Sequence, residues 1–86
     1  MRTRPPWLDW DLELSPHLLK RMTDRRFTEI ELRDMLHTIR GYRRDIVEGR
    51  WVIDTMRRRR RWKIIVEPDL KSHLLVVVTA YPAAPK

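Results

Sequence analysis

Three apolar segments of strand length lie close together in the second half of the chain, and they limit the possible folds more than any other feature. They are 50–56, 62–67 and 74–81, and each is rich in β-branched or aromatic residues. Pro68 and Pro82 are expected to end the second and third, because proline cannot donate a hydrogen bond to a sheet. The third segment is apolar on both faces, which predicts a strand inside the sheet.

The first half of the chain predicts one further strand. Residues 8–14 alternate apolar and acidic side chains, which is the period of a half-exposed strand at or near a sheet edge. Residues 1–7 contain two consecutive prolines, which prevent a helix, so we expect a loose arm there. Residues 42–49 are expected to form a loop, and residues 83–86 a short tail.

Two amphipathic helices are predicted between this strand and the three apolar segments. A serine followed by a proline is a typical helix start and predicts a helix over 16–25. Thr28 and Glu31 have the spacing of a capping box, which predicts a second helix over 29–40. Gly41 is expected to stop that helix.

The predicted order of elements is β-α-α-β-β-β, an α+β fold in a single domain, residues 1–86. Two consecutive helices joined tightly can cover only one face, so both are expected to pack on one face of an antiparallel sheet. Strand periodicity places Trp62, Ile64 and Val66 under the helices. The opposite, open face is expected to carry Arg50, Asp54, Lys63 and Glu67, with Thr79 and Tyr81 or their neighbours.

The composition indicates a polyanionic partner, with nucleic acid as the first choice. The formal net charge is +7, and most of the basic residues are arginine, whose planar fork suits phosphate. A genome rich in G and C would also favour arginine, and we give that alternative equal weight for the composition as a whole. Cysteine is absent and the three histidines are scattered, so no metal or other cofactor is expected. No apolar run reaches membrane-spanning length and no signal-peptide core is present, so we expect a cytoplasmic protein with no membrane partner.

Several short motifs lie at the ends of the predicted elements. They are Ser15-Pro-His17 with Arg21-Met22 and Arg25, then Phe27-Thr-Glu29, and Val66-Glu-Pro-Asp69 with Leu75-Val-Val-Val-Thr-Ala-Tyr-Pro82. With the order of elements, these motifs resemble the RelE/ParE-type toxin superfamily, to which the BrnT and MqsR toxins are similar. They also resemble a small uncharacterised bacterial toxin-like family assigned to that superfamily. The resemblance covers about residues 12–82.

The resemblance implies a RelE-like fold and a toxin of a type II toxin–antitoxin pair. Its partners would be RNA and a cognate antitoxin protein, with the ribosome as a further partner in part of the superfamily. Members include ribosome-dependent mRNA endonucleases, ribosome-independent RNases and gyrase inhibitors. We therefore expect a metal-independent endoribonuclease. The alternatives are a non-catalytic toxin or adaptor that binds a protein such as gyrase, and a plain RNA-binding module.

Metal-free RNA cleavage needs a base for the 2′-hydroxyl, an acid for the leaving oxygen and cations for the phosphate. His17 is the first candidate for the base, because Arg21 and Arg25 follow it on the same helix and suit phosphate. Glu67 is a second candidate base on the open face, and Tyr81 suits phosphate or base contacts. These residues also have ordinary structural alternatives, such as helix capping for His17. His73, in a predicted turn, is a weaker candidate, and His37 is expected to be a surface histidine.

The five consecutive arginines 57–61 are the clearest binding signal. Like charges packed together repel, so the run suggests a counter-anion, and a hairpin loop would let the side chains fan outwards. The alternative is a solvated turn with no partner. The predicted RNA-binding residues are Arg50, Arg57, Arg58, Arg59, Arg60, Arg61, Lys63 and Thr79.

Overall fold

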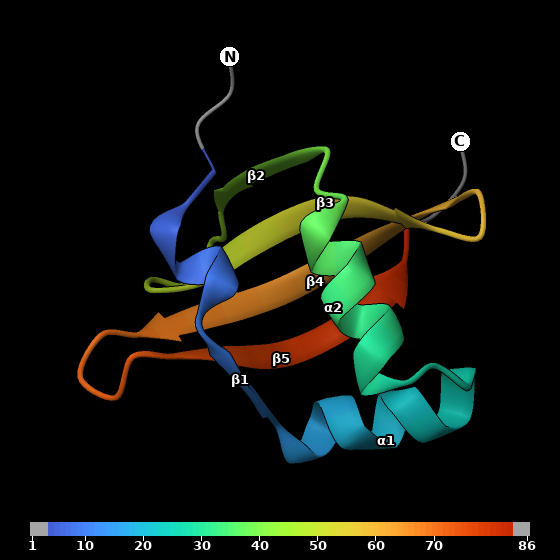
Figure 1. Cartoon of the computed structure of the whole chain (residues 1–86), viewed down its shortest axis with the longest axis horizontal. Helices are drawn as coiled ribbons and strands as arrows, with labels where there is room; N and C mark the ends of the chain where they lie inside the picture. The colour runs from blue at the N-terminus through green and yellow to red at the C-terminus, as the bar shows by residue number, and fades with distance from the viewer. Residues whose placement is uncertain (1–3, 84–86) are drawn as a thin grey trace.

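The computed structural model, which describes residues 4–83, contains one five-stranded mixed sheet and two α-helices (Figure 1). A short 3₁₀-helix precedes them. In chain order the elements are the 3₁₀-helix Pro6–Asp9, β1 (Asp11–Leu14), α1 (Pro16–Arg25), α2 (Glu29–His37), β2 (Gly41–Arg44), β3 (Trp51–Arg57), β4 (Arg60–Asp69) and β5 (Leu74–Pro82). The predicted α+β class is confirmed, but the order of elements is not β-α-α-β-β-β. No helix in the described part of the chain is long and apolar enough to cross a membrane.

The strands lie in the order β1-β5-β4-β3-β2. The predicted antiparallel arrangement holds for β2 to β5 but is wrong for β1, which pairs with β5 in parallel through Asp11–Leu14. The parallel direction of β1 agrees with the chain path, because β1 leads directly into α1, which lies along the C-terminal half of β5. The prediction that 74–81 lies inside the sheet is confirmed, since β5 has β1 on one side and β4 on the other.

A strand that the sequence analysis missed, β2, forms the other edge of the sheet. Residues Gly41–Arg44 pair antiparallel with Trp51–Asp54, so the expected loop over 42–49 is shorter than predicted. Three of the four residues in β2 are exposed. A strand that buries so little has no apolar alternation, and its sequence therefore resembles a loop.

The N-terminal segment also differs from its prediction. Residues 4–7 are not a loose arm, because Trp7 is buried and its ring lies 5.7 Å from that of Trp51 and 6.4 Å from that of Tyr42. Extended backbone begins only at Asp11, since the preceding residues form the 3₁₀-helix. The remainder of the predicted arm, 1–3, and most of the predicted tail, 84–86, lie outside the described residues.

Local hydrogen bonds fix the start of both helices as predicted. The Ser15 hydroxyl accepts a bond from the Leu18 N–H at 3.0 Å, and α1 runs over the predicted 16–25. Thr28 and Glu31 form the predicted reciprocal capping box at 3.0 and 3.1 Å. The second helix ends earlier than expected, with Thr38 as its C-cap, because the Arg40 N–H bonds to the Asp54 carbonyl of the sheet rather than to a carbonyl of the helix. The residue expected to stop that helix is instead the first residue of β2.

The strands β4 and β5 are longer than predicted. Pro68 lies within β4, opposite Leu75 of β5. The pairing of β3 with β4 reaches only to Val66, so Pro68 lies where β4 has a single neighbour. A proline is tolerated there because no strand on the other side needs its missing N–H.

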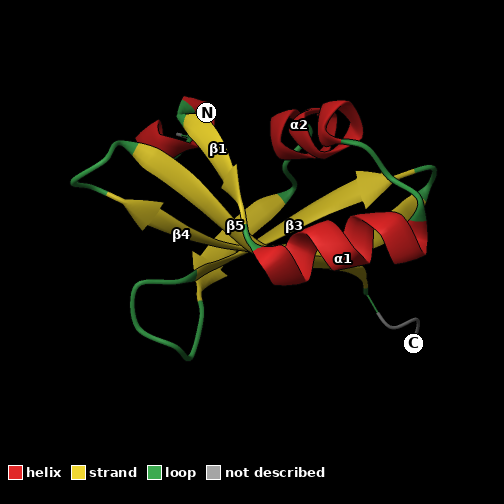
Figure 2. Cartoon of the chain, turned by 90° about the horizontal axis from the view of Figure 1, so that it is seen from below, coloured by secondary structure: helices red, strands yellow, loops and turns green. Residues whose placement is uncertain are grey.

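Both helices contribute to a single core, but they lie differently on the sheet. The helix α2 crosses its face near β3, whereas α1 follows the edge of β5 beyond the end of β1 (Figures 1 and 2). Two side chains attach α1 to that edge: the Ser15 hydroxyl donates to the Val78 carbonyl at 2.6 Å, and Arg25 donates to the Ala80 carbonyl at 3.1 Å. The predicted core positions are confirmed. The buried cluster contains Trp62, Ile64 and Val66 with Leu18 of α1 and Leu32, Met35 and Leu36 of α2.

One buried hydroxyl joins α2 to the sheet. Thr55 is 2% exposed and donates a 2.6 Å hydrogen bond to the Met35 carbonyl. We expect Thr55→Val, which keeps the volume of the side chain, to lower the free energy of unfolding by about 1 kcal/mol through loss of this bond. Urea unfolding measures the change. The matched control is Thr79→Val in β5, a half-exposed position where the change should stay within about 0.5 kcal/mol. Equal stability of Thr55→Val and the wild type would contradict the role of this bond.

Candidate nucleic-acid interface

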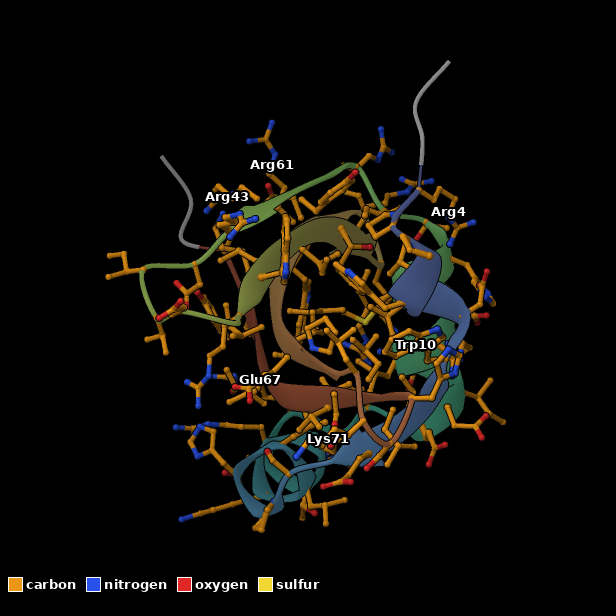
Figure 3. All side chains as sticks on the ribbon, turned by 90° about the vertical axis from the view of Figure 1, so that its left-hand side faces the viewer. Arg4, Trp10, Arg43, Arg61, Glu67 and Lys71 are labelled. Carbon is orange, nitrogen blue, oxygen red and sulfur yellow. The ribbon has the colours of Figure 1, made fainter. Side chains whose placement is uncertain are left out.

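Two adjoining hollows lie around the start of β2 and the β3–β4 hairpin. The first, the β2 hollow, is lined by Arg4, His37, Ile39, Arg40, Gly41, Tyr42, Arg43 and Asp54. The second, the hairpin hollow, is lined by Arg40, Asp54, Thr55, Met56, Arg60, Arg61, Trp62, Lys63, Pro82 and Ala83. They share Arg40 and Asp54 and therefore form a continuous surface. Figure 3 shows Arg4, Arg43 and Arg61 toward the same end of the molecule.

The lining of the two hollows is strongly basic. Their cationic side chains outnumber their carboxylates by six to one, which leaves a large positive excess for an anionic ligand. The carboxylate is that of Asp54. The cations are Arg4, Arg40, Arg43, Arg60, Arg61 and Lys63.

Asp54 fixes the position of two of these cations. Its Oδ1 accepts a 2.8 Å bond from Lys63 Nζ, and its Oδ2 accepts a 2.9 Å bond from Arg43 Nη1. Its backbone carbonyl accepts a 2.7 Å bond from the Arg40 N–H. One carboxylate thus joins three strands, and it holds the charged ends of a lysine and an arginine at fixed places on the surface.

Strand register explains why these residues meet. Asp54 of β3 lies opposite Lys63 of β4 on one side and opposite Gly41 of β2 on the other. Met56 lies opposite Arg61 on the same face. Side chains directly opposite each other in antiparallel strands are close neighbours. The register therefore brings the Asp54 carboxylate next to the Lys63 ammonium group.

The five consecutive arginines do not fan outwards together as expected. Arg57 and Arg60 pair across the end of the hairpin, and only Arg58 and Arg59 form the turn. Both turn residues have positive φ, 50° and 67°, as a two-residue type I′ turn requires. Such turns favour asparagine and glycine, so two arginines there hold a conformation that costs about 1 kcal/mol or more per residue.

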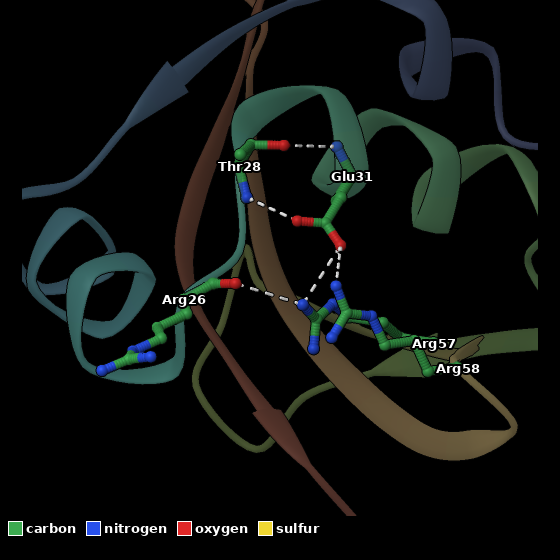
Figure 4. A network of polar contacts seen from close by, with 5 residues as sticks. All are labelled: Arg26, Thr28, Glu31, Arg57 and Arg58. Atoms are coloured by element: carbon green, nitrogen blue, oxygen red, sulfur yellow. Dashed lines mark hydrogen bonds and ion pairs between the residues drawn. The ribbon is translucent and has the colours of Figure 1, made fainter.

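Arg57 points into the protein rather than into solvent. Its guanidinium lies 5.7 Å from the Phe27 ring and 5.3 Å from the Trp62 ring, and its side chain is 11% exposed. Its Nη2 donates to the Arg26 carbonyl at 3.2 Å and to Glu31 Oε2 at 3.1 Å (Figure 4). These contacts give Arg57 a structural role and leave it poorly accessible to RNA.

The other residues that were predicted on the open face of the sheet do not all lie near Lys63. Tyr81 lies directly opposite Lys63, and Thr79 lies opposite Ile65, so of the two alternatives left open for this strand the structure places Thr79 and Tyr81 on the open face. Glu67 is instead bonded to Arg50 at 3.2 Å. It is four residues from Lys63 along β4, or about 13 Å at the rise of a strand. Figure 3 accordingly shows Glu67 well apart from Arg43 and Arg61.

The predicted catalytic group on α1 lines neither hollow. His17 is exposed in the first turn of the helix. Arg21 forms a 4.0 Å ion pair with Asp24, and Arg25 is bonded to the β5 edge. Within residues 4–83, the structure records no contact that joins His17 to the other predicted catalytic residues. His73 stacks on Trp10, with ring centroids 3.9 Å apart.

Several residues of the hollows were missed as site residues. Arg43 was missed because β2 was taken for a loop, and Arg4 because residues 1–7 were taken for a loose arm. The alternation of side chains along a strand correctly placed Asp54 on the open face. Its pairing with Lys63 could also have been predicted, by aligning the two strands about a two-residue turn. No local signal connects His37 or Arg40 with β3.

Glu31 has a lowered pKa. The hydrogen bond from the Thr28 N–H is the main cause, and the charges of Arg57 and Arg58 add to it. A carboxyl group with a lowered pKa in the folded state stabilises the fold above its ordinary pKa, and this contribution is lost as the pH falls through the folded-state value. The stabilisation by Glu31 should therefore be complete at neutral pH, begin to decline near pH 4.5 and be lost as the pH falls through the lowered folded-state pKa.

We expect Glu31→Gln to be less stable than the wild type at pH 7, with the gap narrowing as the pH falls below about 4.5. Urea unfolding at a series of pH values measures the gap. Glu29→Gln is the matched control, because Glu29 lies in the same helical turn and is exposed. It should show a smaller gap. A Glu31→Gln gap that is constant from pH 7 to pH 3 would show that charge is not the cause.

Among residues 4–83, no three histidine, aspartate or glutamate side chains gather in a way that could hold a metal ion. Comparison with known proteins gave no further assignment: no family model, curated protein or solved structure matched the chain.

Proposed function

We propose that this chain binds single-stranded RNA in the two hollows and cleaves it, as the toxin of a cytoplasmic type II toxin–antitoxin pair. The observation that supports this most strongly is the excess of six cations over one carboxylate in the lining of the two hollows. Arginine and lysine on an accessible surface are the main source of affinity for a phosphate backbone. The resemblance of the sequence to RelE/ParE-type toxins supplies the toxin setting.

An extended strand of RNA fits the hollows better than a small anion does. The cations come from the N-terminal segment, from β2 and the residue before it, and from β4, so they could contact several phosphates in succession. The exposed ring of Tyr81 lies beside Lys63 and offers a surface on which a base can stack. Stacking of this kind requires an unpaired base, which favours a single strand over a duplex.

The same cations suit a metal-independent cleavage. Attack of a 2′-hydroxyl on the neighbouring phosphate builds negative charge on the phosphoryl oxygens, and fixed cations stabilise that charge. Lys63 and Arg43 are fixed in this sense, because Asp54 holds both. A cognate antitoxin with an acidic segment would inhibit the toxin by covering these cations.

A non-catalytic protein is the second candidate, either a plain RNA-binding module or an inhibitor that binds an acidic protein target such as gyrase. One observation favours this non-catalytic candidate, and it concerns the catalytic residues that were predicted from the sequence. Within residues 4–83, no contact joins His17, Glu67 and Tyr81 into an acid–base pair.

RNA binding is tested by removing two exposed cations of the hairpin hollow, Arg60 and Arg61. Each phosphate contact on a single strand contributes about 0.7 to the slope of log affinity against log salt. If both arginines contact phosphate, Arg60→Ser/Arg61→Ser should flatten that slope by about 1.4 and weaken binding regardless of RNA sequence. A salt titration with a fluorescent single-stranded RNA measures both quantities.

The matched control is Lys20→Ser/Lys71→Ser, which removes the same charge from α1 and from the β4–β5 turn. Its slope should equal that of the wild type. Equal flattening in the two variants would show that RNA responds only to net charge, and would remove the hairpin hollow from the binding site.

Cleavage is tested by incubating the purified protein with single-stranded RNA in excess EDTA. The endoribonuclease should produce fragments ending in 2′,3′-cyclic phosphate and 5′-hydroxyl groups, because the 2′-oxygen is the nucleophile. Replacing the riboses by deoxyriboses should abolish the products without abolishing binding. RNA that is bound but remains intact would support the non-catalytic candidate instead.

A further inference from the structure

A histidine that resembles an ordinary surface residue in the sequence lies in the β2 hollow. His37 is the last residue of α2, and it lines this hollow together with Arg40, Arg43 and Asp54. Its side chain is 49% exposed, so a ligand in the hollow can reach the ring. His37 is therefore the histidine that shares a concave surface with the cations of the proposed RNA site.

A carboxylate accompanies this histidine. Asp9 Oδ1 lies 4.0 Å from His37 Nε2. A carboxylate on that side of the ring favours the proton on Nε2, which leaves Nδ1 as the nitrogen that can accept a proton. In many active sites the catalytic base is oriented by a neighbouring group, and Asp9 is placed to do this for His37.

The position of Asp9 is fixed from α2 itself. Arg33 lies one helical turn before His37, and its guanidinium donates to the Leu8 carbonyl and to the Trp10 carbonyl, both at 3.0 Å. These two carbonyls flank Asp9 on either side in the chain. The same helix thus carries the histidine and the arginine that holds the backbone on either side of Asp9, whose own side chain is 77% exposed.

We propose that His37 is the general base of RNA cleavage in the β2 hollow and that Asp9 is its positioning residue; this rests on the proposed endoribonuclease function. Nδ1 of His37 takes the proton of a ribose 2′-hydroxyl, and the 2′-oxygen forms a bond to the adjacent phosphorus. The bond from phosphorus to the 5′-oxygen breaks, and that oxygen takes a proton from water. The hydroxide that remains takes the proton from His37, which returns to the neutral imidazole. The products are a 2′,3′-cyclic phosphate and a 5′-hydroxyl, with the phosphate held by Arg40 and Arg43.

This assignment replaces His17 as the first candidate base for a geometric reason. His17 lies on the surface of α1 and lines neither hollow, whereas His37 lies beside the cations that would hold the phosphate. A base must be within hydrogen-bonding reach of the proton that it removes. Phosphate bound in the hollows brings the 2′-hydroxyl toward His37.

The decisive variants are His37→Ala and His17→Ala, each assayed for cleavage of a single-stranded RNA, for RNA affinity and for unfolding. His37→Ala should slow cleavage by about 10²- to 10⁴-fold, the usual effect of a positioned acid–base group, with affinity changed less than about 2-fold. Added imidazole should restore part of the lost rate, which a merely structural role would not allow. His37→Gln keeps a polar side chain of similar size and should be equally slow.

Asp9→Asn tests the positioning role separately. It should lower kcat by about 10-fold while leaving KM unchanged, because the amide no longer favours one tautomer but the RNA contacts persist. Wild-type kcat in this variant would remove Asp9 from the site.

The outcomes distinguish the inference from the function on which it rests. A wild-type protein that binds but never cleaves RNA overturns both. A wild type that cleaves, with His37→Ala and His37→Gln at the same rate, overturns only the role of His37. Loss of cleavage in His17→Ala with retention in His37→Ala returns the base to α1. Loss of RNA affinity in His37→Ala, without rescue by imidazole, makes His37 a binding residue instead.

Discussion

The interaction on which the other contacts depend is the packing of the Arg57 guanidinium against the Phe27 and Trp62 rings, 5.7 and 5.3 Å away. Its bonds to the Arg26 carbonyl and to Glu31 join the end of α1, the start of α2 and the β3–β4 hairpin at a single point. A buried cation is tolerated only when paired, so the capping box that orients Glu31 also makes this arrangement possible. The hairpin is thereby held against the helices, while its two-residue turn sets the register that brings Asp54 to Lys63.

The two faces of the sheet have different roles. The face under α2 is apolar and supplies the core, while the opposite face carries charged groups in fixed pairs. Repulsion between the cations of the hollows opposes folding, and Asp54 offsets only part of it. A surface that keeps this excess charge, and holds Lys63 and Arg43 in place, is already organised for an anion before the anion arrives.

One edge of the sheet is covered by a helix, and the other is an exposed short strand. The edge of β5 beyond β1 is covered by α1, through Ser15 and Arg25. The opposite edge is the short strand β2, whose Arg43 and Arg44 disfavour pairing with another copy of the same edge. The uncovered edge therefore lies next to the hollows, so the same arginines protect the sheet and contribute to the proposed site.

The sequence by itself determined the features that depend on near neighbours along the chain. Ser15, Thr28 and Glu31 start the two helices through hydrogen bonds that reach only three residues, and the period of the strands identified the buried face of β4. Tertiary structure decided the rest, because the forces involved join distant segments. Trp7 is ordered by rings from β2 and β3, β2 exists because β3 offers an edge, and Arg57 turns inward because Phe27 and Glu31 receive it. His37 reaches the cations of the hollows for the same reason: the end of α2 meets β2 only in the folded chain.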